Sequence, residues 1–158
     1  MLLPAVQAIS ERTGVDAATV FVALFAMTVN QVHGVDPVVV RPMMDNRFRP
    51  GLADVVCTAA QNAICVLDVA DARFEEVLER ARRSVLTASK HACVDPRDVA
   101  AVVERVQAER GVDLAIHCFL NGVRVTVRID TAAVAPADAE ALAWRLETNA
   151  LAQAGAHA

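Results

Sequence analysis

The apolar residues of the N-terminal third recur at helical spacing. Pro4 suits the first turn of a helix that ends at Gly14, and Asp16 is a good N-cap for a second helix that runs to about His33 and closes at Gly34. The second segment contains ATVFVALFAMTV, which is apolar nearly all round. Because such a helix has no polar face, it is expected to be buried on several sides at the centre of the fold.

A strand pattern follows this helix. The run PVVVRPMM is short, β-branched and bounded by prolines, which predicts a buried strand leading into the loop DNRFRPGLAD. A second strand is expected over about Ala63 to Val69.

Two more helices are predicted in the middle of the chain. From Ala72 to His91 the apolar residues recur at helical spacing, and Glu79 precedes Arg83 by four residues on the outer face. Asp95 and Pro96 open another helix, which stops at Gly111 and has the apolar stripe Val99, Val102, Val103 and Val106.

The last third alternates in the manner of a β-hairpin. Residues 114–120 and 123–129 each place an apolar residue at every second position, and Asn121-Gly122 between them is a type I′ turn signal. A final helix from Pro136 to about Ala152 is expected to bury Leu142, Leu146 and Ala150. The order of elements predicts an α/β two-layer sandwich with a mixed, mainly antiparallel sheet, and without any linker or repeat the chain is expected to be a single domain over 1–158.

Composition narrows the classes of partner. The chain is 55% hydrophobic with a net charge of −4, so it should fold and has no electrostatic reason to bind nucleic acid. Its longest apolar run, Val20 to Met27, is too short to span a bilayer, and the N-terminus lacks a secretory signal pattern. We therefore expect a cytoplasmic protein without a membrane span. The four cysteines show no CxxC spacing and are expected to be reduced, buried thiols.

No motif for catalysis, metal binding or cofactor binding is present. The serines lie in helical patterns without a GxSxG elbow, and His91 and Cys93 are two residues apart, a spacing that does not make helical residues face each other. The histidines lack metal-ligand spacing, and no GxGxxG or GxxxxGK[ST] loop occurs. We therefore assign no catalytic residue, no metal and no cofactor, and we interpret the charge run from Glu75 to Arg83 as a solvated face.

The loop DNRFRPGLAD concentrates Asn46, Arg47, Phe48 and Arg49 at the end of a buried strand, where binding residues are often presented. The planar guanidinium of Arg47 suits a phosphate or a carboxylate. In the alternative interpretation, Arg47 or Asn46 ties the loop to neighbouring backbone carbonyls.

A family resemblance emerges over the stretch from Thr13 to about Ala92. The sequence TGVDAATVFVALFAMTVNQVHGVDPVVVRPMMDNRFRPGLADVVCTAAQNAICVLDV resembles the second half of condensation domains of nonribosomal peptide synthetases, with a helix, a strand, an NR-containing loop and a further strand in the family's order. SKHACVDP is similar to the family segment that begins with a histidine, here His91, and FLNGVRVTVRID with the last helix is similar to its closing strands and terminal helix. The resemblance spans nearly all of this chain and only the last part of the family's domain.

The resemblance implies the second lobe of a chloramphenicol-acetyltransferase-like fold. In the family, two lobes surround a tunnel where two carrier-protein-bound acyl chains meet, and the catalytic HHxxxDG motif lies in the first lobe. This chain contains no HH pair, so it is expected to join acyl or aminoacyl thioesters by amide or ester formation only with an upstream lobe that carries HHxxxDG. Phosphopantetheinyl carrier proteins are the other implied partners. The resemblance implies substrate-channel positions for Asn46, Arg47, Gln61 and Asn62, and a place for Arg47 near the lobe junction.

Two other hypotheses remain open. The first is a non-catalytic, degenerate condensation lobe that would dock carrier proteins or synthetase domains. An unrelated α/β domain would oligomerise through its hairpin. A high mean hydropathy of +0.37 favours a face that a partner covers.

Overall fold

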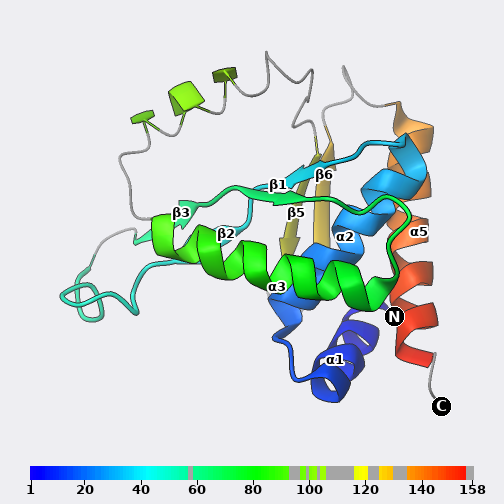
Figure 1. The fold of residues 1–158 in the computed structure, drawn as a ribbon, viewed down its shortest axis with the longest axis horizontal. Coiled ribbons are helices and arrows are strands. Elements are labelled where there is room, and N and C mark those ends of the chain that lie inside the picture. Colours follow the sequence, from blue (N-terminus) through cyan, green and yellow to red (C-terminus); the bar gives the residue numbers. More distant parts are fainter. Residues whose placement is uncertain are drawn as a thin grey trace.

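A computed structural model gives the architecture in Figure 1. It describes residues 1–56, 59–92, 97–98, 100–102, 104–105 and 135–155, and the strand backbone of 116–120 and 125–129. The elements in chain order are α1 (Leu2–Thr13), α2 (Ala17–His33), β1 (Val38–Val40), β2 (Met43–Asp45), β3 (Ala60–Asn62), β4 (Cys65–Leu67), α3 (Phe74–His91), β5 (Ile116–Leu120), β6 (Val125–Ile129) and α5 (Pro136–Gly155). This mixed α/β arrangement confirms the predicted fold class.

Helix α2 lies at the centre of the fold, as its all-round apolar sequence predicts. It packs against α1, α3, α5 and β1, and every residue from Thr19 to Ala26 is buried. The Asp16 carboxylate caps its start by accepting a hydrogen bond from the Thr19 N–H at 2.9 Å. Gly34 ends it in the left-handed conformation with φ 68°, which glycine adopts without strain.

A long two-stranded β-ribbon lies alongside α3 (Figure 1). β1 and β2 form one strand of the ribbon, and β3 and β4 form the other. Val38 pairs with Leu67 and Asp45 pairs with Ala60, and the register between them is continuous although the ladder is assigned as two separate antiparallel pairs. The interruption falls at Pro42, which has no N–H to donate to a ladder. The expected single strand over PVVVRPMM is therefore two short strands, β1 and β2, in one register.

One face of the ribbon packs against the C-terminal half of α3. Ala63 and Cys65 are buried against Ala88 and Ala92, a cluster that Val40, Met44 and Val85 extend at its margin. Because side chains alternate along a strand, the neighbouring positions face away from α3. Val66 accordingly keeps 50% of its surface exposed between the buried Cys65 and Leu67.

The remaining elements follow the predicted order. β5 and β6 pair antiparallel with Ile116 opposite Ile129, which confirms the hairpin, while its predicted turn at 121–122 lies outside the described residues. α5 buries Leu142, Leu146 and Ala150 as expected. Of the helix predicted to open at Asp95 and Pro96, the described residues 97–98, 100–102 and 104–105 are helical, and Val99, Val103 and Val106 lie outside the description.

The sheet differs from the expectation in one respect. The predicted sheet is present as three two-stranded antiparallel ladders in the described part of the chain. No single described helix is long and apolar enough to cross a bilayer; α1 and α2 satisfy length and composition only when taken together, and they are bent by 114° at the break between them.

The N-cap of α2 provides a test of this packing. We expect Asp16→Ala to lower the free energy of unfolding by about 1 kcal/mol, because the Thr19 N–H loses its acceptor at the start of the central helix. Urea unfolding followed by circular dichroism measures this. The matched change Asp54→Ala, at an exposed turn residue, should stay within about 0.5 kcal/mol of the parent chain. Equal effects of the two changes would contradict a capping role for Asp16.

Candidate functional site

The candidate site is the loop between β2 and β3, of which the structure describes residues 46–56; we call this segment the tip loop. It projects beyond the end of the ribbon formed by β2 and β3, at the left of the molecule in Figure 1 and far along the longest axis from α5. It contains Asn46, Arg47, Phe48 and Arg49, the residues that the sequence singles out.

Asn46 is the buried anchor of the tip loop, with 1% of its surface exposed. Its side-chain amide donates to the carbonyl of Ala59 at 3.0 Å and to the carbonyl of Ala92 at 3.5 Å. The first bond closes the base of the loop, and the second reaches the residue that follows α3. A buried amide with these partners holds the loop base in place, because leaving such groups unpaired is costly.

Arg49 extends the anchor to the end of α3. Its Nε donates to the Asn46 side-chain oxygen at 3.2 Å, and its Nη2 donates to the carbonyls of Ser89 at 3.0 Å and Lys90 at 2.9 Å. These carbonyls belong to the last turn of a helix, where backbone acceptors lack intrahelical partners and a cation is favoured. Asn46 and Arg49 therefore form a clasp between the tip loop and α3.

Arg47 shapes the tip loop from within. Its Nη1 donates to the carbonyl of Val55 at 2.9 Å and to that of Leu52 at 3.4 Å, while its own N–H donates to the Asp45 carboxylate at 3.0 Å. The side chain is nevertheless exposed at the surface. This geometry agrees with the alternative in which Arg47 and Asn46 tie the loop to backbone carbonyls.

Gln61 and Asn62 lie on β3 and face opposite sides of the ribbon. Gln61 is half-buried and shares the alternation of the buried Ala63 and Cys65, whereas Asn62 is exposed on the outer side. The structure therefore places Asn46 and Gln61 toward one face and does not gather the four residues around a single point. Their role in a substrate channel stays a prediction.

Large apolar side chains are exposed on the tip loop and on β2 next to it. Phe48 keeps 67% of its surface exposed, Val56 is fully exposed, and Met43 at the start of β2 keeps 63% exposed. The guanidinium of Arg49 lies 5.5 Å from the centre of the Phe48 ring. Large apolar side chains gathered at one end of a molecule mark an interaction surface.

The histidines of the described residues lack the setting of a general base. His33 ends α2 with its Nε2 buried and without a hydrogen-bond partner among the described residues, and His91 is exposed at the end of α3. No group of His, Cys, Asp and Glu side chains in the described part of the chain could hold a metal ion.

Cys65 is a structural thiol. It is free and buried, and this burial raises the pKa of the Cys65 thiol, an effect that a hydrogen bond with the Ser84 side chain partly offsets. A raised pKa disfavours the nucleophilic thiolate. The expected buried, reduced state is confirmed for Cys65, whereas the side chains of Cys57, Cys93 and Cys118 lie outside the described residues.

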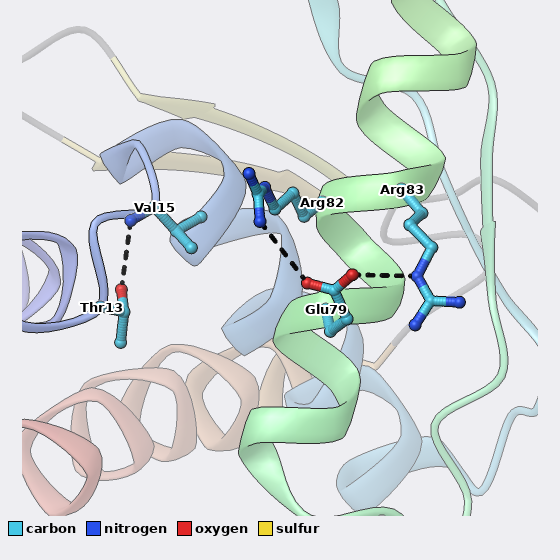
Figure 2. Close-up of polar contacts among 5 residues, drawn as sticks. All are labelled: Thr13, Val15, Glu79, Arg82 and Arg83. Atoms are coloured by element: carbon cyan, nitrogen blue, oxygen red, sulfur yellow. Dashed lines mark hydrogen bonds and ion pairs between the residues drawn. The ribbon is translucent and has the colours of Figure 1, made fainter.

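The charge run on α3 is a solvated face, as predicted. Glu79 lies 3.0 Å from Arg83 Nε and 3.9 Å from Arg82 Nη1, and all three side chains are exposed (Figure 2). Figure 2 also shows the bond from the Val15 N–H to the Thr13 hydroxyl at the turn between α1 and α2. Exposed pairs of this kind contribute little to stability.

Comparison with known proteins identifies the fold. No protein-family model matches the sequence, and no curated protein is significantly similar to it. Among solved structures, the first condensation domain of the calcium-dependent antibiotic synthetase, in complex with a substrate analogue, matches with a TM-score of 0.74 and 15% identity over 99% of this chain. The SgcC5 protein from Streptomyces globisporus matches with a TM-score of 0.62 and 12% identity over 96% of this chain.

These likenesses show that the chain has a condensation-domain-like fold. The match takes up 43% of the synthetase domain and 46% of SgcC5, so the chain spans less than half the length of either structure. The expected fold resemblance is confirmed. The structure adds Arg49 to the predicted site. Sequence patterns did not indicate its contacts, because its partners on α3 are 40 and 41 residues away in the sequence.

The clasp can be tested with two asparagines of the candidate site. We expect Asn46→Ala to lower the free energy of unfolding by about 1 to 3 kcal/mol, because the side-chain oxygen that accepts from Arg49 and the donor to Ala59 are both lost from a buried position. Asn62→Ala, on the exposed outer side of β3, should change it by less than about 0.5 kcal/mol.

Urea unfolding gives both values, and hydrogen exchange locates the effect. Amides of the tip loop and of the last turn of α3 should exchange faster in Asn46→Ala than in the parent chain, while α1 and α2 keep their protection. Faster exchange spread evenly over the whole chain would argue against a local clasp.

Proposed function

We propose that this chain is the C-terminal lobe of a condensation domain, one structural unit over residues 1–158 that joins carrier-protein-bound acyl or aminoacyl thioesters by amide or ester formation when an upstream lobe completes it. The observation that carries the proposal is the extent of the structural match. The condensation-domain fold accommodates 99% of this chain within 43% of its own length. A chain of this kind supplies one part of a two-part enzyme.

The chemistry explains why a second part is required. In amide formation, the acceptor amine attacks the carbonyl carbon of the donor thioester, the carbon–sulfur bond breaks, the thiol of the carrier leaves and the amine loses a proton. A positioned base or an equivalent electrostatic partner assists this step. His33 and His91 are not placed to do so, and the HHxxxDG motif expected of the upstream lobe would supply the missing histidine.

The tip loop suits the junction with that upstream lobe. Its base is anchored by Asn46, and the loop presents the exposed apolar side chains of Phe48 and Val56 together with the exposed, cationic Arg47. Arg47 would then contact a carboxylate or phosphate across the junction, as its planar fork favours. Asn46, Arg49 and Gln61 would hold the ribbon so that the loop keeps its position.

A second function, a non-catalytic docking lobe for carrier proteins or synthetase domains, has one observation in its favour. Asn46 and the guanidinium of Arg47 donate hydrogen bonds to backbone carbonyls of their own loop and its base. These bonds hold the loop in shape, which a docking lobe requires, and they are made to the chain itself and not to a substrate. The two functions differ in one measurable respect, which is whether peptide-bond formation depends on this chain.

A reconstitution assay separates these functions. We expect the isolated chain to be inactive with aminoacyl thioesters, and co-expression with an upstream lobe containing HHxxxDG to yield a soluble complex that condenses them. Substituting the second histidine of that motif by alanine provides the control, since it should abolish condensation and leave the complex intact. A complex that forms without any condensation would favour the docking lobe, and activity of the isolated chain would overturn the proposal.

The contact surface can be tested in the same system. We expect Val56→Glu, at a fully exposed position in the tip loop, to reduce co-purification with the upstream lobe at least tenfold, because a charge would be buried at the junction. Val35→Glu, on the turn after α2, should leave co-purification unchanged if both variants keep the parent melting temperature. Equal losses in the two variants would remove the tip loop from the junction.

A further inference from the structure

Helix α5 has a second apolar stripe, opposite to the one that packs into the core. Its buried residues Leu142, Leu146 and Ala150 face α1 and α2. The outer stripe recurs with steps of four and three residues through Ala137, Ala141, Trp144, Thr148, Leu151 and Gly155. This spacing is the heptad repeat by which α-helices pair with one another.

The outer stripe lies open to solvent. Trp144 keeps 64% of its surface exposed and Leu151 keeps 42%, although tryptophan and leucine are among the side chains that gain most from burial. The guanidinium of Arg145 lies 5.7 Å from the centre of the Trp144 ring. In Figure 1 α5 forms the right edge of the molecule.

The charges beside the stripe indicate which partner fits. Glu140 and Arg145 flank the stripe on opposite sides and are five residues apart. Side chains three or four residues apart on a helix lie close together, so Glu140 and Arg145 do not pair within α5. Neither residue forms an ion pair within the described part of the chain. In two parallel helices joined by a heptad seam, the residue before one core position faces the residue five further along the partner helix. Glu140 of one α5 would then meet Arg145 of an identical α5.

We propose that α5 pairs in parallel and in register with α5 of a second copy of this chain. The two Glu140–Arg145 contacts lie on either side of a seam in which each Trp144 packs beside the small residues Ala141 and Thr148. The shared stripe is about 27 Å long, from the rise of 1.5 Å per residue between Ala137 and Gly155. A seam of this length buries a small interface, so the dimer should form reversibly with concentration.

This surface is separate from the one assigned to the proposed function. The tip loop and α5 lie at opposite ends of the longest axis in Figure 1. The two surfaces share no residue, so dimerisation can hold or fail independently of the condensation activity.

Charge reversal gives the first test, by sedimentation velocity of the 158-residue chain across a concentration series. We expect a monomer–dimer equilibrium that Glu140→Arg and Arg145→Glu each weaken at least fivefold. The double variant E140R/R145E should restore it, because the two contacts re-form with reversed signs. Mixing the two single variants should also yield more dimer than either gives alone, since both contacts of the mixed dimer then pair an arginine with a glutamate. A chain that stays monomeric, or a dimer that ignores both reversals, would overturn the proposal.

Cysteine cross-linking gives the second test and fixes the geometry. In a parallel, in-register pair, equivalent residues of the seam face each other across the two-fold axis. Ala141→Cys should therefore form a disulfide-linked dimer under mild oxidation, and Ala143→Cys, at an exposed alanine of the same helix outside the stripe, should not exceed the parent chain. Equal cross-linking of both variants, or cross-linking of Ala143→Cys alone, would contradict the proposed pairing.

Discussion

The burial of α2 is the constraint on which the rest of the structure depends. Ten of its residues are buried, and α1, α3, α5 and β1 all pack against it. Burial of apolar surface is the main favourable contribution to folding, so the elements that cover α2 are held by a common core. Polar groups reinforce the packing where they can be paired: Asn149 on α5 donates to the Thr28 hydroxyl at 3.0 Å and to the Gln31 side-chain oxygen at 2.9 Å.

The position of the candidate site follows from this core through α3. One side of α3 packs on α2, and its C-terminal half carries the inner face of the ribbon. The clasp of Asn46 and Arg49 then fixes the tip loop to the last turn of the same helix. A loop anchored in this way can present Phe48 and Arg47 at a defined place, which an unanchored loop of the same composition would not.

Local signals in the sequence predicted most of the elements. The N-cap at Asp16, the glycines at 14 and 34 and the all-round apolar helix between them act within a few residues, and the structure bears them out. The boundaries of the ribbon were less predictable, because Pro42 breaks the hydrogen-bond ladder while the β-branched pattern continues past it. The clasp could not be predicted, since Arg49 reaches carbonyls of α3 that only the folded chain brings near.

In the candidate site, too, some features could be predicted from local sequence and others could not. The sequence pointed to the tip loop through its concentration of Asn46, Arg47 and Arg49, yet alternation along β3 separates Gln61 from Asn62 onto two faces of the ribbon. The outer stripe of α5 was also present in the sequence as a repeat of four and three. It was hidden by the stronger core pattern of Leu142, Leu146 and Ala150 on the same helix, and the exposure of Trp144 and Leu151 distinguishes the two faces.

The central claim is that a second lobe completes this chain at the tip loop. Hydrogen exchange of the chain, measured with and without the upstream lobe that carries HHxxxDG, tests it most directly. The account predicts slower exchange in the tip loop and at the adjoining ends of β2 and β3, with α1 unchanged. No change in the tip loop, or protection confined to α1 and α5, would contradict it.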